Sequence, residues 1–193
     1  DGVIRSIIPG GASPFRKLTA EIDNRGTIQI DLYPNERIGI ALSYYTTEDD
    51  YENSQIGLTA AEESSINLDV NFSVNKDTTL YGFVTKDEIE SEMSGAVSFS
   101  ATPWNSFAED EILTWGVGIN GRIDKKWSYG FDYVSSEADG NILTDSGAGE
   151  APFPVLTTEL TNARAYVKYK LKGPWGMGLD IYREQYDSND WYI

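Results

Sequence analysis

The chain has 193 residues, enough for one domain of ordinary size, and it contains neither cysteine nor histidine. Their absence excludes disulfides, Cys/His zinc sites, thiol or imidazole catalysis and the covalent attachment of a c-type haem to this chain. The formal net charge of -16 argues against a nucleic-acid-binding surface, while 12% aromatic residues are too many for a disordered acidic chain.

Apolar and polar residues alternate in eight segments, which is the period of a β-strand with one oily and one wet face. Several segments have about 9 to 11 residues, the length with which a tilted strand crosses a bilayer. No segment has a helical period, and none approaches the roughly 20 apolar residues of a membrane-spanning helix. The predicted strands are Leu18–Leu32, Ile38–Tyr45, Ile66–Val74, Thr78–Thr85, Leu113–Ile123, Trp127–Ser135, Leu160–Leu171 and Trp175–Tyr186.

The predicted connections alternate between short and long. In an up-and-down meander, successive connections lie at opposite ends of the sheet, so the short turns share one end and the long loops the other. Short periplasmic turns and long extracellular loops are typical of an outer-membrane β-barrel. The short turns are Pro34-Asn35-Glu36, Asn75-Lys76-Asp77, Asp124-Lys125-Lys126 and Lys172-Gly173-Pro174, and the long loops are Thr46–Ser65, Lys86–Ile112 and Ser136–Glu159.

Charged and aromatic residues follow the same division. Acidic residues crowd the three long loops, where Lys86 is the only basic residue, whereas basic residues lie in or beside the short turns. This sorting indicates either ordinary solvated loops or a negatively charged outer rim. Aromatic residues gather near the segment ends, as in the interfacial girdles of membrane barrels or as ordinary strand-forming residues. Together these features favour an all-β, antiparallel up-and-down transmembrane β-barrel over a soluble β-domain.

In such a barrel, the apolar face of each strand contacts lipid and the other face lines the lumen. The lipid-facing candidates are Ile66, Leu68, Val70, Phe72, Val74, Trp115, Val117, Trp127, Phe131, Leu179 and Ile181. The lumen-facing candidates are Asn67, Asp69, Asn71, Gly116, Gly118, Arg122, Asp132, Arg164, Lys168, Lys170, Gly176, Gly178 and Asp180. The glycines among them indicate either a lumen occupied by something large or strands that coil easily.

We find no constellation of residues that indicates catalysis. The serines have no histidine partner, and no two carboxylates are required by the sequence to converge. The acidic clusters Glu48-Asp49-Asp50 and Glu109-Asp110-Glu111 carry oxygen ligands suited to Ca²⁺. Neither matches an EF-hand loop, and we favour the interpretation that both are solvated acidic loops. We therefore expect neither an enzyme nor a metal or cofactor site in this chain.

A series of motifs in order along the chain resembles the C-terminal part of the MtrB/PioB family of outer-membrane barrels. The motifs are Tyr51–Thr59, Glu62-Glu63-Ser64, Ile66–Val74, Ser98–Trp104, Thr114–Gly118, Gly130–Val134, Tyr182–Tyr186 and Asp190-Trp191. The resemblance implies a bacterial outer-membrane sleeve whose lumen holds a periplasmic multihaem c-type cytochrome, which meets an extracellular one. It also implies that the haem belongs to these partner cytochromes and that the barrel carries no cofactor. Membrane lipid is the other expected partner, and nucleic acid is not expected.

The family barrels end in a further strand with an aromatic C-terminus, whereas this sequence stops at Asp190-Trp191-Tyr192-Ile193. We therefore expect residues 1–193 to be a single barrel segment, the C-terminal part of a larger barrel without its closing strand. Four cations, Arg122, Arg164, Lys168 and Lys170, are expected either to meet haem propionates or an acidic cytochrome surface, or to pair with Asp69, Asp132 and Asp180 across the wall. A diffusion porin or small stand-alone barrel, and a soluble β-sandwich binding module, are the alternatives.

Overall fold

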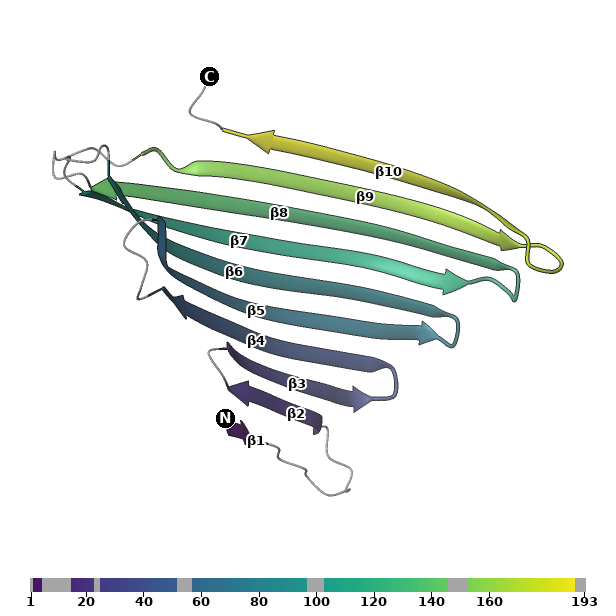
Figure 1. Ribbon diagram of the computed structural model, residues 1–193. Helices are drawn as coiled ribbons and strands as arrows, with labels where there is room; N and C mark the ends of the chain where they lie inside the picture. The colour runs from purple at the N-terminus through teal and green to yellow at the C-terminus, as the bar shows by residue number, and fades with distance from the viewer. Residues whose placement is uncertain are drawn as a thin grey trace.

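The computed structural model describes residues 2–4, 15–22, 25–51, 57–96, 103–145 and 153–189. These residues form one sheet in which each strand pairs antiparallel with its neighbour in the sequence, so the strand order follows the chain (Figure 1). The all-β, up-and-down architecture predicted from the sequence is confirmed. The strands are β1 (Gly2–Ile4), β2 (Phe15–Ile22), β3 (Arg25–Asn35), β4 (Ile38–Asp50), β5 (Gly57–Asn75), β6 (Thr78–Ala96), β7 (Pro103–Arg122), β8 (Trp127–Asp145), β9 (Leu156–Lys170) and β10 (Gly176–Ser188).

The prediction of one strand over Leu18–Leu32 is wrong, because this range contributes to both β2 and β3. The two strands pair antiparallel, with Leu18 opposite Ile30 and Ile22 opposite Gly26. The intervening Asp23 and Asn24, which lie outside the described residues, are turn-favouring residue types. The apolar alternation continues on both sides of them, which is why the periodicity alone did not reveal the break.

The long loops predicted from the sequence are mostly strand. β5, β6 and β8 have 19 residues each and β7 has 20, nearly twice the about 9 to 11 residues that cross a bilayer. The polar ends of these strands keep their backbone ladder, for example with Glu62 opposite Glu90 and Glu90 opposite Glu109. The apolar band, the stretch in which apolar and polar residues alternate, is shorter than these strands. Beyond it the alternation is absent, although the backbone hydrogen bonding between the strands continues.

The short turns lie along one edge of the sheet (Figure 1). The side-chain Oδ1 atoms of Asn35, Asn75 and Asp124 each accept hydrogen bonds from backbone N–H groups two or three residues further on, at 2.7 to 3.1 Å. The backbone N–H groups of Lys126 and Trp127, which donate to Asp124, lower the pKa of its carboxyl below the ordinary value. The fourth turn contains Gly173 with φ of 74°, a left-handed conformation that glycine adopts without strain. Local turn chemistry thus fixes each hairpin and its register.

The sheet is a single layer without a core of its own. Within the described ranges, no hydrophobic side chain is buried, and Ile66, Val117 and Leu179 are 49, 48 and 64% exposed. A β-sandwich packs two such sheets face to face around a shared core. The described residues form one sheet and not the two facing sheets of the alternative β-sandwich, so an apolar face of this extent needs another cover. None of the described residues forms a helix long and apolar enough to cross a membrane.

Candidate functional site

Strand register sorts the side chains into two faces. Leu42, Leu68, Val84 and Trp115 lie opposite one another in one row on β4 to β7. We call this side the apolar face, and the opposite side the polar face. Register and strand alternation place every predicted lipid-facing residue on the apolar face and every predicted lumen-facing residue on the polar face. Which face meets lipid and which meets the lumen stays a prediction at this point.

Glycines of the polar face lie under aromatic rings from neighbouring strands. Gly116 lies opposite Phe83 and Gly118 opposite Tyr81, both across the β6–β7 pair. A Cβ atom would stand 2.5 Å from Cε1 of Phe83 at the first glycine and 2.5 Å from the Tyr81 hydroxyl at the second. The rings therefore occupy the space that side chains at these positions would need. Neither of the two explanations offered from the sequence anticipated this use of glycine.

The same arrangement recurs two strands away, where the Tyr166 ring of β9 lies over Gly130 of β8. A Cβ atom at Gly130 would stand 2.5 Å from Cζ of Tyr166, and the two residues are directly opposite in the ladder. Covering a strand glycine with a cross-strand aromatic ring shields the backbone and fixes the register. These rings lie along the sheet surface instead of standing away from it.

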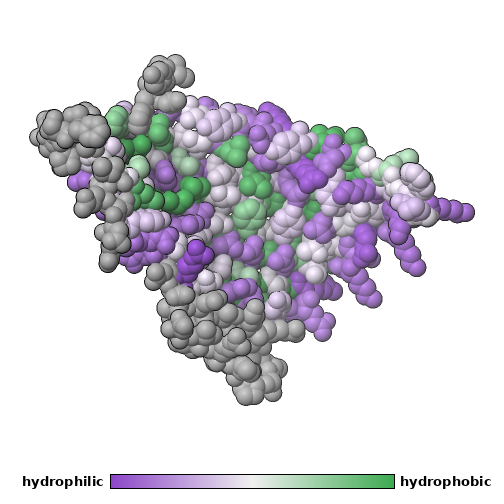
Figure 2. Space-filling model, in the orientation of Figure 1, coloured by the Kyte–Doolittle hydropathy of each residue, from purple (hydrophilic) through white to green (hydrophobic). Residues whose placement is uncertain are grey.

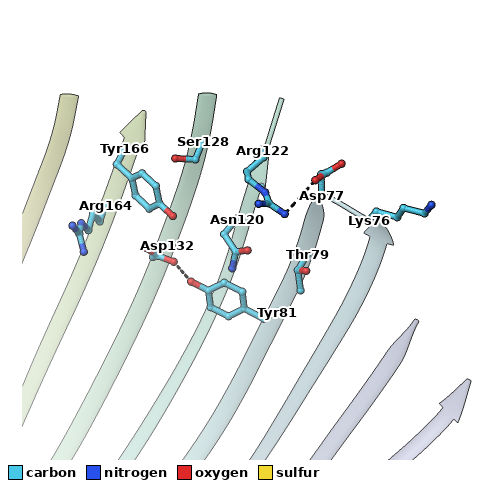
Figure 3. A pocket seen from close by; sticks show the side chains of 11 residues that line it. Lys76, Asp77, Thr79, Tyr81, Asn120, Arg122, Ser128, Asp132, Arg164 and Tyr166 are labelled. Carbon is cyan, nitrogen blue, oxygen red and sulfur yellow. Dashed lines mark hydrogen bonds and ion pairs between the residues drawn. The ribbon is translucent and has the colours of Figure 1, made fainter. Parts of the chain in front are cut away.

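A hydrogen bond ties the aromatic ring of β6 to β8. The Tyr81 hydroxyl reaches across Gly118 of β7 and donates to a carboxylate oxygen of Asp132, which lies opposite Gly118 (Figure 3). The bond is possible because the glycine between the two side chains leaves its place on the polar face empty. Three strands are thereby held in one register by a contact that sequence spacing does not show.

The predicted cations divide into paired and unpaired groups. Arg164 makes a bidentate contact with Asp180, with Nε at 3.0 Å from Oδ1 and Nη2 at 2.5 Å from Oδ2. The prediction that cations pair across the wall is therefore correct for Arg164. Arg122 Nη2 lies 3.4 Å from Oδ1 of Asp77, a turn residue that the sequence did not single out. Lys168 and Lys170, in contrast, form no ion pair with any residue that the structure describes.

The other predicted acidic candidates are engaged locally. Asp132 accepts from Tyr81, as above, and Asp69 accepts a hydrogen bond from Nδ2 of Asn67 at 2.5 Å. The Lys168 ammonium lies 4.8 Å from the centre of the Tyr166 ring, within cation–π range. Hence Lys168 contacts the wall through an aromatic ring and not through a carboxylate.

A hollow of about 560 Å³ opens on the polar face toward the edge that carries the short turns (Figure 3). Hydroxyl, amide and charged side chains line it, so it suits polar or ionic contacts and not an apolar ligand. Hydrophilic side chains also project from this edge of the sheet in the space-filling view (Figure 2). The lining includes Thr79, Tyr81, Asn120, Arg122, Ser128, Asp132, Arg164 and Tyr166.

Acidic residues gather at the other end of the strands. Glu48, Glu62, Glu90 and Glu109 lie opposite one another on four successive strands, β4 to β7. Like charges directly opposite in a sheet repel, so this row costs stability and gives this end a strongly negative surface. Across the described ranges, no group of three or more acidic side chains is arranged to hold a metal ion.

A single-layer meander with one apolar face, one polar face and short turns along one edge is the wall of an outer-membrane β-barrel. The solved copper transporter OprC has a similar fold, with a TM-score of 0.63 at 12% identity over 85% of this chain and 31% of that chain. Residues 24–193 match the family described as outer membrane beta-barrel porin, MtrB/PioB. The chain belongs to this family, as its resemblance indicated.

A relative of known name agrees with this assignment. The chain is 26% identical over 159 residues to the outer membrane protein MtrB of Shewanella baltica (strain OS185), covering 81% of this chain. It spans 23% of the length of that relative. The protein is therefore an outer-membrane β-barrel protein, of a family of barrels and not of enzymes.

Proposed function

We propose that this chain is part of the wall of a larger barrel that holds and insulates a multihaem c-type cytochrome for electron transfer across the outer membrane. The family relation supports this proposal, since the MtrB/PioB resemblance implies such a sleeve. The fraction of the MtrB relative that the chain spans, 23%, supports a larger barrel of which residues 1–193 form one segment. The periplasmic cytochrome occupies the lumen, and an extracellular one meets it at the outer mouth.

In this arrangement the apolar face contacts lipid and the polar face lines the lumen. Lipid supplies the cover that the exposed apolar side chains require, because their burial is favourable at roughly 25 cal/mol per Å². The row of Ile40, Val70, Gly82 and Val117 lies near the middle of the apolar band. Water and the partner meet the opposite face, where Asn71, Asp132 and other polar side chains lie.

The observation that carries the proposal is the flattened polar face. Narrow barrels fill their interior with side chains that stand into the lumen. Here Tyr81, Phe83 and Tyr166 lie along the wall over Gly118, Gly116 and Gly130. This keeps the lumen clear beside the wall, as a large occupant requires.

The chain itself supplies geometry and insulation. Without cysteine it cannot attach a c-type haem, and without histidine it lacks the usual axial ligand, so the haem is carried by the partner. A low-dielectric wall in lipid separates the haem chain from the surrounding ions. No catalytic step is assigned to the barrel.

A visible absorption spectrum tests the proposal directly. The full-length protein is extracted from native outer membranes in detergent by an affinity tag, and its spectrum is recorded oxidised and reduced. Sharp haem bands that co-purify in fixed ratio are the expected result. A colourless preparation would refute the electron-conduit role.

A diffusion porin is the second candidate, favoured by the family description as a porin. The two functions differ in the conductance of the purified protein in planar bilayers. A sleeve filled by its cytochrome conducts ions poorly, whereas a diffusion porin gives large, open conductance steps without any haem protein present.

A further inference from the structure

We propose that Arg122, Lys168 and Lys170 form a docking surface for acidic side chains of the protein that occupies the lumen, at the periplasmic end. The inference rests on the proposed function and adds the chemistry and the orientation of the contact. It follows from four observations on the polar face: the placement of the three cations, the open space beside the two lysines, the engagement of nearby carboxylates, and the opposite charge further along the strands.

The three cations lie together on the polar face next to the short turns. Arg122 is opposite Ser128, and Ser128 is opposite Lys168, in one row across β7, β8 and β9. Adjacent strands are about 4.8 Å apart, so the Cα atoms of Arg122 and Lys168 are about 10 Å apart. Lys170 is two residues further along β9, on the same face. Both lysines are exposed, and the Arg122 side chain is 65% exposed, so all three are accessible to a partner.

Glycines leave the space beside the lysines open. Gly178 lies opposite Lys168 and Gly176 opposite Lys170 on β10. A Cβ atom at Gly178 would stand 3.2 Å from Cγ of Lys168, so the stem of this lysine uses the room that the glycine leaves. No side chain of β10 therefore stands between the lysine ammonium groups and the lumen in these two rows.

The carboxylates that could neutralise these cations are already engaged. Asp180 is held by Arg164, and Asp132 accepts from the Tyr81 hydroxyl. Asp77 lies 3.4 Å from Arg122 in an exposed ion pair, which contributes little and is readily exchanged. The two lysines have no carboxylate within ion-pair distance in the described part of the chain. The most favourable counter-charge for them therefore comes from outside the wall.

The charge of the polar face changes from positive to negative toward the extracellular end. Register places Glu63, Asp87 and Asp110 on this face, well beyond the aromatic–glycine pairs. An occupant with acidic side chains at its periplasmic end is attracted by the three cations and repelled by the three acids. Complementary charge of this kind sets orientation and register more than total affinity. The docking surface thus fixes the depth to which the partner enters the lumen and the orientation in which it does so.

The test uses the full-length protein purified from native membranes together with its co-purifying haem protein. Lys168→Gln and Lys170→Gln are combined in one variant, and Lys125→Gln and Lys172→Gln, which change turn residues, are combined in a control of equal charge. Each preparation is washed on the affinity resin with increasing NaCl, and retained haem is measured at each step. Heat-dependent gel migration verifies that the barrels are folded.

We expect haem to leave the Lys168/Lys170 variant about five- to tenfold faster than the wild type at low salt, a difference that disappears at high salt. The control variant is expected to match the wild type. Equal haem retention in all three proteins, or equal loss in both variants, would overturn the docking surface and leave the sleeve intact. Absence of haem from every preparation would overturn both proposals.

Discussion

The glycine beneath the Tyr81 ring offers a sharp test of how the polar face is built. In Gly118→Ala, the new Cβ atom would lie 2.5 Å from the Tyr81 hydroxyl and 2.9 Å from Oδ1 of Asp132. The ring must swing away, and its hydrogen bond to Asp132 is lost. A hydrogen bond to a charged group contributes about 1.5 to 3 kcal/mol, and the partly exposed position favours the lower value.

The same substitution also acts on the unfolded chain. Replacing glycine by alanine at a compatible backbone position stabilises a protein by about 0.4 to 1 kcal/mol. Gly118 has no positive φ, so its backbone accepts alanine. The expected net effect of Gly118→Ala is therefore a loss of about 1 kcal/mol in the free energy of unfolding. In a Tyr81→Ser background the ring is absent, so Gly118→Ala should become stabilising.

The assay is urea unfolding of the full-length protein in detergent micelles, followed by tryptophan fluorescence. Gly82→Ala is the matched control, because the nearest atoms to its Cβ would lie at 3.4 and 3.5 Å, in ordinary contact. It should be neutral or slightly stabilising in both backgrounds. Equal destabilisation by Gly118→Ala with and without the Tyr81 ring would refute the reasoning.

Three further predictions use the same unfolding assay. Val117→Arg, in the middle of the apolar band, should cost about 2 to 4 kcal/mol, whereas Asn71→Arg on the polar face should cost little; equal costs would contradict the face assignment. Because the folded turn lowers the pKa of Asp124 from 3.8, its carboxylate stabilises the fold above that value and ceases to do so as the pH falls below it. Asp124→Asn, which keeps the acceptor oxygen without the titration, should therefore lose less stability than the wild type as the pH falls through 3.8 and below, and parallel profiles would exclude the turn as the cause. Arg164→Gln and Asp180→Asn, made singly and together, should have nearly additive effects on the free energy of unfolding, since both partners are exposed; strong non-additivity would indicate that the pair is shielded from water.

The acidic row lies at the ends of β4 to β7 away from the short turns, and it works against strand pairing there. Glu48, Glu62, Glu90 and Glu109 repel one another across the ladder, yet the strands remain paired there. Nearer the short turns, backbone pairing along the apolar band joins all four strands, and the aromatic–glycine pairs join β6 to β7, which offsets this repulsion. Within the described residues, this acidic row thus lies on paired strands and not in loops.

The sequence by itself determined the two faces of the wall. Successive side chains of a strand point to opposite sides, so alternation in residues such as Ile66 to Val74 assigns each one to a face without reference to any partner. The turn residues Asn35, Asn75 and Asp124 are equally local, because each accepts hydrogen bonds from its own turn. Because the 193 residues contain no cysteine, the sequence also excluded the thioether attachment of a c-type haem to them.

Only the tertiary structure decided what lies beside each residue on its face. Register between strands is a long-range property, so the sequence could not place Tyr81 over Gly118 or bring its hydroxyl to Asp132, 51 residues away. Nor could it show that Asp180 is taken by Arg164 while Lys168 is left unpaired. Strand length was also hidden, because backbone pairing continues beyond the point where the alternation of apolar and polar residues ends.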